Sequence, residues 1–121
     1  MLSPEQLEEF TACAHKNNLD VVVEVHTHEE LQKIAGLDTN VIIGVNNRNL
    51  KDFSTNVGHA IEIINTMDPH RTIIAESAFS TPADYALYQD KIDAALIGTA
   101  LLISDDPSAT LISFTSHARR S

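Results

Sequence analysis

The stretch NVIIGVNNRNL, residues 40–50, joins an apolar run to a cluster of polar side chains. Its first half has the β-branched residues and the length of a buried strand. Its second half places asparagines and an arginine directly behind that strand. A buried strand that ends in amide and guanidinium groups is typical of a sheet whose edge holds a ligand. This stretch therefore predicts a strand that leads into a binding site.

The rest of the chain alternates such apolar runs with segments of helical periodicity. Helix starts are indicated by a capping residue with proline, glutamine or glutamate in the first turn. In the first helix, Leu7, Phe10 and Ala14 are expected on the buried face. The predicted strands are 19–25, 40–45, 71–77 and 93–98, and the predicted helices begin at Ser3-Pro4, at the capping box Thr27-x-x-Glu30, near residue 57, at Thr81-Pro82 and at Asp106-Pro107.

This alternation predicts an α/β fold with a parallel sheet and right-handed crossovers. A doubly wound sheet and part of a TIM (βα)8 barrel are both compatible with it. The length of 121 residues predicts a single domain. The chain contains neither GxGxxG nor GxxxxGK[ST], which argues against a dinucleotide-binding fold and against a P-loop enzyme.

Strand alternation assigns the polar strand ends to one face of the predicted sheet. Each strand has one apolar face and one face that turns polar or small at its C-terminal end. Alternate strands of a barrel supply side chains to the same layer, so Glu24 and Glu76 are expected close together at the C-terminal mouth. Two carboxyls in a partly desolvated site have separated pKa values, which suits one of them to proton transfer. The alternative is that both are solvated strand-end residues.

Composition and charge limit the partners of the chain. Eight Lys and Arg residues against 17 Asp and Glu residues give a net charge of −9, which disfavours nucleic acid and anionic membrane surfaces. Cys13 is the only cysteine, so neither an intrachain disulfide nor a cysteine-based zinc site is expected. No apolar stretch reaches the roughly 18 residues of a transmembrane helix, and the N-terminus does not resemble a signal peptide. We therefore expect a cytoplasmic protein.

His26 and His28 form an H-x-H pair that invites a metal interpretation. No third ligand follows at a suggestive spacing, so cap-region or surface histidines are the preferred interpretation. The sequence therefore predicts neither a metal nor a cofactor.

Four segments, VEVHTHEEL, IIGVNNRNL, IAES and ALIGTALL, resemble the indole-3-glycerol phosphate synthase family in their order and spacing. The most specific segment is GVNNRNL, where the family shows a G-[IV]-N-x-R-[DN]-L pattern. The resemblance covers nearly the whole chain, as a single domain over residues 1–121. It implies the C-terminal half of a TIM (βα)8 barrel, from helix four through helix eight with strands five to eight.

Members of this family are carboxy-lyases of tryptophan biosynthesis. They close 1-(2-carboxyphenylamino)-1-deoxyribulose 5-phosphate to indole-3-glycerol phosphate, with loss of carbon dioxide and water. The resemblance therefore implies a phosphorylated small-molecule substrate. By the same resemblance, Glu24 contributes to acid–base chemistry, Asn46 hydrogen-bonds the substrate and Glu76 lines the site, and these three are the implied catalytic residues. The implied substrate-binding residues are Arg48, Ser77, Ala78, Gly98 and Thr99.

The chain departs from the family in two respects. Ala78 replaces the glycine that usually follows Glu-Ser, and alanine is strained wherever the backbone needs a positive φ. The family's catalytic lysines belong to the other half of the barrel, and Lys33, Lys51 and Lys91 match none of them. The resemblance therefore implies a chain that is inactive alone and needs a complementary N-terminal half.

Two alternatives remain open at this point. The first is a non-catalytic, truncated half-barrel, whose unpaired sheet edges and apolar barrel-facing surface would drive self-association. The second is another phosphate-binding (βα)8 enzyme, such as phosphoribosylanthranilate isomerase.

Overall fold

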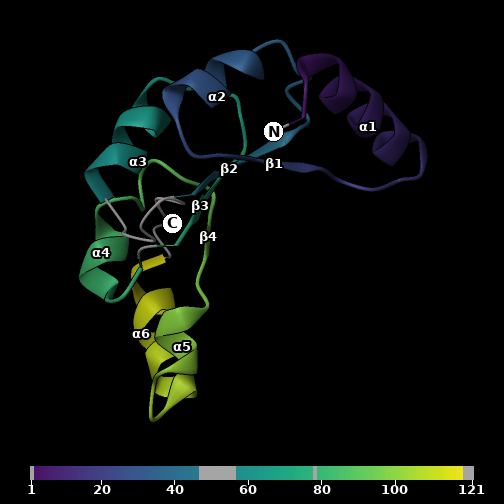
Figure 1. Ribbon diagram of the computed structural model, residues 1–121. Helices are drawn as coiled ribbons and strands as arrows, with labels where there is room; N and C mark the ends of the chain where they lie inside the picture. Colours follow the sequence, from purple (N-terminus) through teal and green to yellow (C-terminus); the bar gives the residue numbers. More distant parts are fainter. Residues whose placement is uncertain (1, 47–56, 78, 119–121) are drawn as a thin grey trace.

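The computed structural model of the protein describes residues 2–46, 57–77 and 79–118. Its four strands form one sheet in the order β1-β2-β3-β4, and every neighbouring pair is parallel. The helices form an arc on the outer side of this curved row of strands (Figure 1). The strands are β1 (Val22–Val25), β2 (Ile42–Asn46), β3 (Ile73–Glu76) and β4 (Ala94–Leu96). The predicted parallel α/β fold is confirmed, and it is consistent with part of a TIM barrel.

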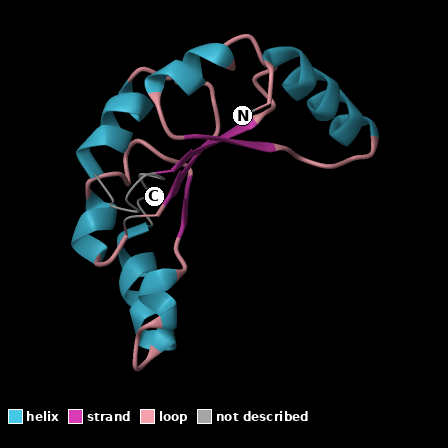
Figure 2. Ribbon diagram, in the orientation of Figure 1, coloured by secondary structure: helices cyan, strands magenta, loops and turns pink. Residues whose placement is uncertain are grey.

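Helices alternate with the strands along the chain (Figure 2). The sequence predicted one helix after the last strand, but the structure has two. The additional one, α5, is a single turn whose N-cap, Gly98, makes no side-chain capping bond. A turn of this length is too short to show helical periodicity in sequence. The helices are α1 (Pro4–Lys16), α2 (His28–Lys33), α3 (Val57–Asn65), α4 (Pro82–Ala86), α5 (Thr99–Leu102) and α6 (Pro107–Ala118).

The helix starts follow the predicted caps, with one correction. Capping boxes begin α1 at Ser3 and α4 at Thr81. At α2, the Thr27 hydroxyl accepts a hydrogen bond from the N–H of Glu30 (3.1 Å), as expected. The Glu30 carboxylate, however, accepts the N–H of His26 at 2.6 Å and not that of Thr27. The predicted reciprocal bond is therefore wrong, because this carboxylate turns towards the end of β1.

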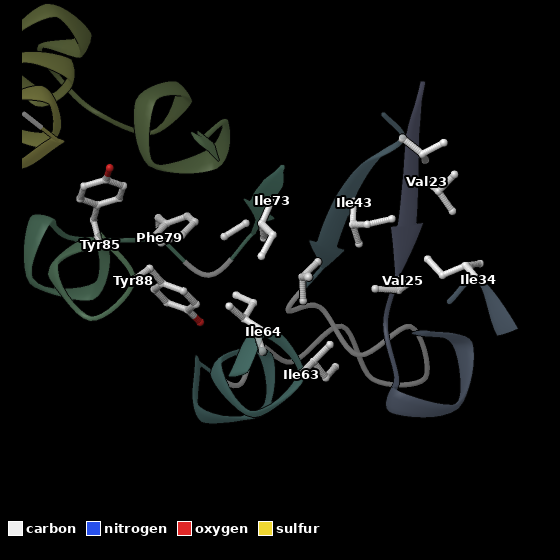
Figure 3. Packing of buried hydrophobic residues seen from close by; sticks show 14 of the residues in the cluster. Val23, Val25, Ile34, Ile43, Ile63, Ile64, Ile73, Phe79, Tyr85 and Tyr88 are labelled. Atoms are coloured by element: carbon white, nitrogen blue, oxygen red, sulfur yellow. The ribbon is translucent and has the colours of Figure 1, made fainter. Parts of the chain in front are cut away.

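The hydrophobic core lies between the outer face of the sheet and the helices. Val25 and Val45 are fully buried there, in one hydrophobic cluster with Ile34 and Ile63. Phe79 and Tyr88 extend this core beyond β3, with ring centroids 5.1 Å apart in an edge-on arrangement. Burial of each valine or isoleucine side chain of this core contributes about 1.5–3 kcal/mol to the stability of the folded chain. Figure 3 shows the packing of these residues.

The opposite face of the sheet is open. Val22 on β1 is 48% exposed and Leu96 on β4 is 61% exposed, whereas their strand neighbours Val23 and Ala95 turn towards the helices. The predicted alternation of faces is therefore confirmed. Among the described residues, no helix is long and apolar enough to span a membrane.

One prediction for the first helix is wrong. Phe10 is 53% exposed, and Thr11 is the buried residue of α1. Leu7 is partly buried and packs against the core, as expected. The reason is the place of α1 at the end of the arc, beside β1 alone (Figure 1). A helix that packs against a single strand buries a narrower stripe of its own surface than the sequence pattern assumes.

Candidate functional site

Three side chains from three strands meet on the open face of the sheet. The strand register pairs Glu24 with Gly44, and Asn46 with Glu76. The Asn46 Nδ2 atom donates a hydrogen bond to Glu24 Oε1 at 2.8 Å. Glu76 lies close enough to Glu24 that hydrogen bonding with Glu24 and its negative charge raise the pKa of the Glu76 carboxyl. The structure therefore brings together the three residues for which a catalytic role was predicted.

Glu76 has the most altered acidity of this cluster. The residue is only 8% exposed. Burial raises its pKa to about 7, and the hydrogen bond and negative charge of Glu24 act in the same direction. A carboxyl group with this pKa is present in both protonation states near neutral pH, so it can accept or release a proton there.

Gly44 lies between the two carboxylates, on the middle strand. A Cβ atom at this position would lie 2.5 Å from Glu76 Oε1. The Glu76 side chain therefore passes over the backbone of β2 on its way to Glu24. The sequence analysis assigned Gly44 no role, because strand alternation does not show which side chain crosses a glycine.

His26 also belongs to the site. Its Nε2 atom lies 3.1 Å from Glu24 Oε1, and its Nδ1 atom lies 3.5 Å from Glu30 Oε2. Nε2 is buried and has no aligned hydrogen-bond partner among the described residues. His26 directly precedes the N-cap of α2 and its N–H donates to Glu30, so the preferred interpretation as a cap-region residue is confirmed, but its contact with Glu24 was not predicted. His28 is exposed at the start of α2. The signal in the sequence that could have assigned His26 to the site is the alternation of β1, which reaches His26 two residues beyond Glu24.

The potential for metal binding is limited in this region. Among residues 2–46, 57–77 and 79–118, no group of three His, Cys, Asp or Glu side chains is arranged to hold a metal ion.

The predicted substrate-binding residues follow the ends of β3 and β4. Ser77 has a φ of 64°, a left-handed conformation that costs about 1–2 kcal/mol for residues with a side chain. Gly98 and Thr99 form the start of α5, where a Cβ on Gly98 would meet no atom of the described residues within 4 Å. The first N–H that donates within this turn is that of Leu101, which bonds the carbonyl oxygen of Gly98. Arg48 and Ala78 lie outside the described residues.

The described lysines lie at the other end of the sheet. Lys16 and Lys33 are in the last turns of α1 and α2, just before β1 and β2. Lys91 precedes β4 and donates to Asn65 Oδ1 at 3.2 Å. In the part of the chain that the structure describes, the carboxylates therefore have no lysine at their end of the strands.

Comparison with known proteins identifies the family. The family model for indole-3-glycerol phosphate synthase matches residues 1–114. The chain belongs to the indole-3-glycerol phosphate synthase family. An indole-3-glycerol phosphate synthase of Acinetobacter baylyi is 37% identical over 107 residues, which are 88% of this chain and 40% of that protein. The synthase of Shouchella clausii is 34% identical over 118 residues, covering 97% of this chain and 46% of its own length. The chain thus spans less than half the length of these synthases.

Proposed function

We propose that the chain forms part of an indole-3-glycerol phosphate synthase of tryptophan biosynthesis. The reaction is the decarboxylative, dehydrative ring closure of 1-(2-carboxyphenylamino)-1-deoxyribulose 5-phosphate. Membership of the family supports this proposal, since the relatives reported above carry the name of that synthase. The observation that carries it is the cluster of Glu24, Asn46 and Glu76 on the open face of the sheet.

The three residues of the cluster take different roles in this proposal. The reaction removes a carboxyl group and a hydroxyl group from the substrate, so protons must be accepted and delivered during ring closure. Glu24 and Glu76 form the acid–base pair, and the pKa of Glu76, raised to about 7, suits proton exchange near neutral pH. The Asn46 amide, which already donates to Glu24, orients the substrate at the same end of the strands.

The phosphate group of the substrate is placed at the ends of β3 and β4. The space above Gly98 that the described residues leave open supports this placement, since they do not prevent a ligand from approaching the backbone there. The amides of Gly98 and Thr99 and the hydroxyl of Ser77 are hydrogen-bond donors for phosphate oxygens. Arg48 and Ala78 complete the proposed phosphate site.

We propose further that the 121-residue chain is inactive by itself. A cationic proton donor for the leaving hydroxyl contributes roughly 10²- to 10⁴-fold to such a reaction, and the described lysines lie at the wrong end of the strands. Residues 1–121 would act as one domain, equivalent to helix four through helix eight of the barrel, with a complementary half-barrel as partner. The chain would function in the cytoplasm, with no nucleic acid or membrane partner.

The test is a ring-closure assay with the purified chain. We expect no formation of indole-3-glycerol phosphate by the chain alone. Activity should appear when the chain is mixed with the segment of the Acinetobacter baylyi synthase that it does not cover, and Glu24→Gln should abolish that activity. Turnover by the chain alone would contradict the proposed inactivity. Failure of the mixture, with both parts folded and associated, would contradict the proposed function.

The non-catalytic half-barrel remains a second candidate. It is favoured by the open apolar positions Val22 and Leu96, which lie on the two edge strands of the described sheet. In that case the chain self-associates through this face and no complement restores activity. The observations presented above do not favour an isomerase, because the matching family model and the relatives reported above are synthases.

A further inference from the structure

The carboxyl groups of Glu24 and Glu76 meet across a strand that belongs to neither of them. Glu24 is on β1, Glu76 is on β3, and β2 runs between them. The register pairs Gly44 with Glu24 on one side and with Ile74 on the other. Glu76 is two residues further along β3 than Ile74, so its side chain reaches back diagonally over Gly44 towards Glu24.

The space above Gly44 is narrow on two sides. A Cβ atom at this position would lie 2.5 Å from Glu76 Oε1 and 3.1 Å from Glu76 Cδ. On the other side it would lie 3.2 Å from Val22 Cγ1. Real Cβ atoms essentially never approach a heavy atom to 2.5 Å, so a methyl group and the Glu76 carboxyl cannot occupy this space together.

The movable group in this contact is the carboxyl. It stands at the end of a flexible side chain, whereas the backbone of β2 is held by parallel neighbours on both sides. Alanine is also better suited than glycine to a strand interior, by about 0.5–1 kcal/mol. Alanine at position 44 would therefore leave the sheet intact and displace the carboxyl from Glu24.

We propose that Gly44 is a positioning residue: its missing side chain opens the passage over β2 through which Glu76 reaches Glu24, and so allows the two carboxyl groups to act as a pair. This inference rests on the proposed function for its catalytic meaning. The geometric part of the inference, that the Glu76 side chain passes over Gly44, concerns only the folded chain and does not depend on the proposed function.

The groups around Glu76 indicate what displacement would do. The titratable groups beside it on described elements are Glu24 and, behind Glu24, His26. The neighbouring β4 presents Leu96 at the paired position. The pKa of Glu76 is raised by burial first and by Glu24 second. Because a displaced carboxyl loses the contact with Glu24 and moves towards solvent, both causes weaken together.

The test is Gly44→Ala in the isolated chain, with the side-chain carboxyl carbons of Glu24 and Glu76 followed by NMR during a pH titration. We expect the titration midpoint of Glu76 to fall from about 7 towards its ordinary value of 4.5. Gly36→Ala is the matched control, because a Cβ there meets nothing within 4 Å. Its titration should equal that of the parent chain.

Two further variants keep the inference falsifiable. In a Glu24→Gln background, Gly44→Ala should shift the Glu76 midpoint by less than it does in the parent chain, because the partner carboxylate is already absent. Glu76→Asp leaves Gly44 unchanged and shortens the side chain by one methylene, so its carboxyl cannot extend as far over β2; a lowered midpoint of this carboxyl is expected and tests the same passage if the alanine variant does not fold. A folded Gly44→Ala chain with an unchanged Glu76 midpoint would overturn the inference. The titration needs no substrate, so its result is independent of the ring-closure assay.

Discussion

At the scale of single residues, the acidity of Glu76 follows from its position. Its carboxyl is covered by the sheet and lies against Glu24, which together raise its pKa to about 7. The exposed carboxyl of Asp68 behaves in the opposite way. Hydrogen bonds from the backbone and side chain of His70 hold the pKa of Asp68 below its usual range. Burial therefore distinguishes the carboxyl of Glu76, which is proposed for proton exchange, from the exposed carboxyl of Asp68.

The raised pKa has a consequence for stability. Between about pH 4.5 and about pH 7 the folded chain binds the Glu76 proton that the unfolded chain has released. The free energy of unfolding therefore falls as the pH rises through this interval. Glu76→Gln should remove this part of the pH dependence and stabilise the chain relative to the parent at pH 8, which urea unfolding at several pH values can measure. An equally steep dependence in the variant would show that other groups cause it.

At the scale of helices and strands, the sequence predicted most of the order of the elements but not every local feature. Apolar runs located the four strands, and capping residues located the starts of α1 and α4. The sequence did not reveal α5, the direction of the Glu30 carboxylate or the exposure of Phe10. These features depend on tertiary neighbours, which a local pattern does not contain.

The candidate site was predictable to a similar extent. Strand alternation was enough to place Glu24 and Glu76 together at the C-terminal mouth, and the family resemblance added Asn46. It did not reveal that Gly44 gives Glu76 its path, because that path runs diagonally across three strands. It also left His26 unassigned, although His26 continues the alternation of β1 beyond its last residue.

The cap of α4 supports the aromatic part of the core. The Thr81 hydroxyl accepts the N–H of Asp84, and the Asp84 carboxylate accepts the N–H groups of Ser80 and Thr81. Thr81→Ala removes one of these bonds and should lower the free energy of unfolding by about 1 kcal/mol. Ser80→Ala is the control, because it keeps the backbone N–H that donates to Asp84, and its effect should stay within about 0.5 kcal/mol. Chemical denaturation measures both, and equal losses would argue against the cap.

At the scale of the whole molecule, the arc of helices covers one face of the sheet and leaves the other open (Figure 1). The open face carries the candidate site, but it also carries apolar side chains at both edge strands. Exposed apolar surface beside unpaired strand edges favours association with another chain. This association is compatible with a complementary half-barrel and with a second copy.

We expect the isolated chain to self-associate through this face. Leu96→Glu should shift the chain towards monomer, because a charge at this exposed position opposes contact between two apolar faces. Leu19→Glu is the matched control, since both leucines are 61% exposed and Leu19 lies outside the sheet. Sedimentation at several concentrations gives the masses. A parent chain that remains monomeric at all of them would contradict this prediction.

The two faces of the sheet also affect how the sequence can change over time. Neighbouring residues of one strand share a backbone, but one packs against the helices and the next lies on the open face. Substitutions at exposed positions of the open face can therefore accumulate without disturbing the packed layer beneath. Glu76 differs from the exposed residues of that face, because it is only 8% exposed, like the least buried residues of the core. At that position, adaptation of the chemistry and preservation of the fold constrain each other.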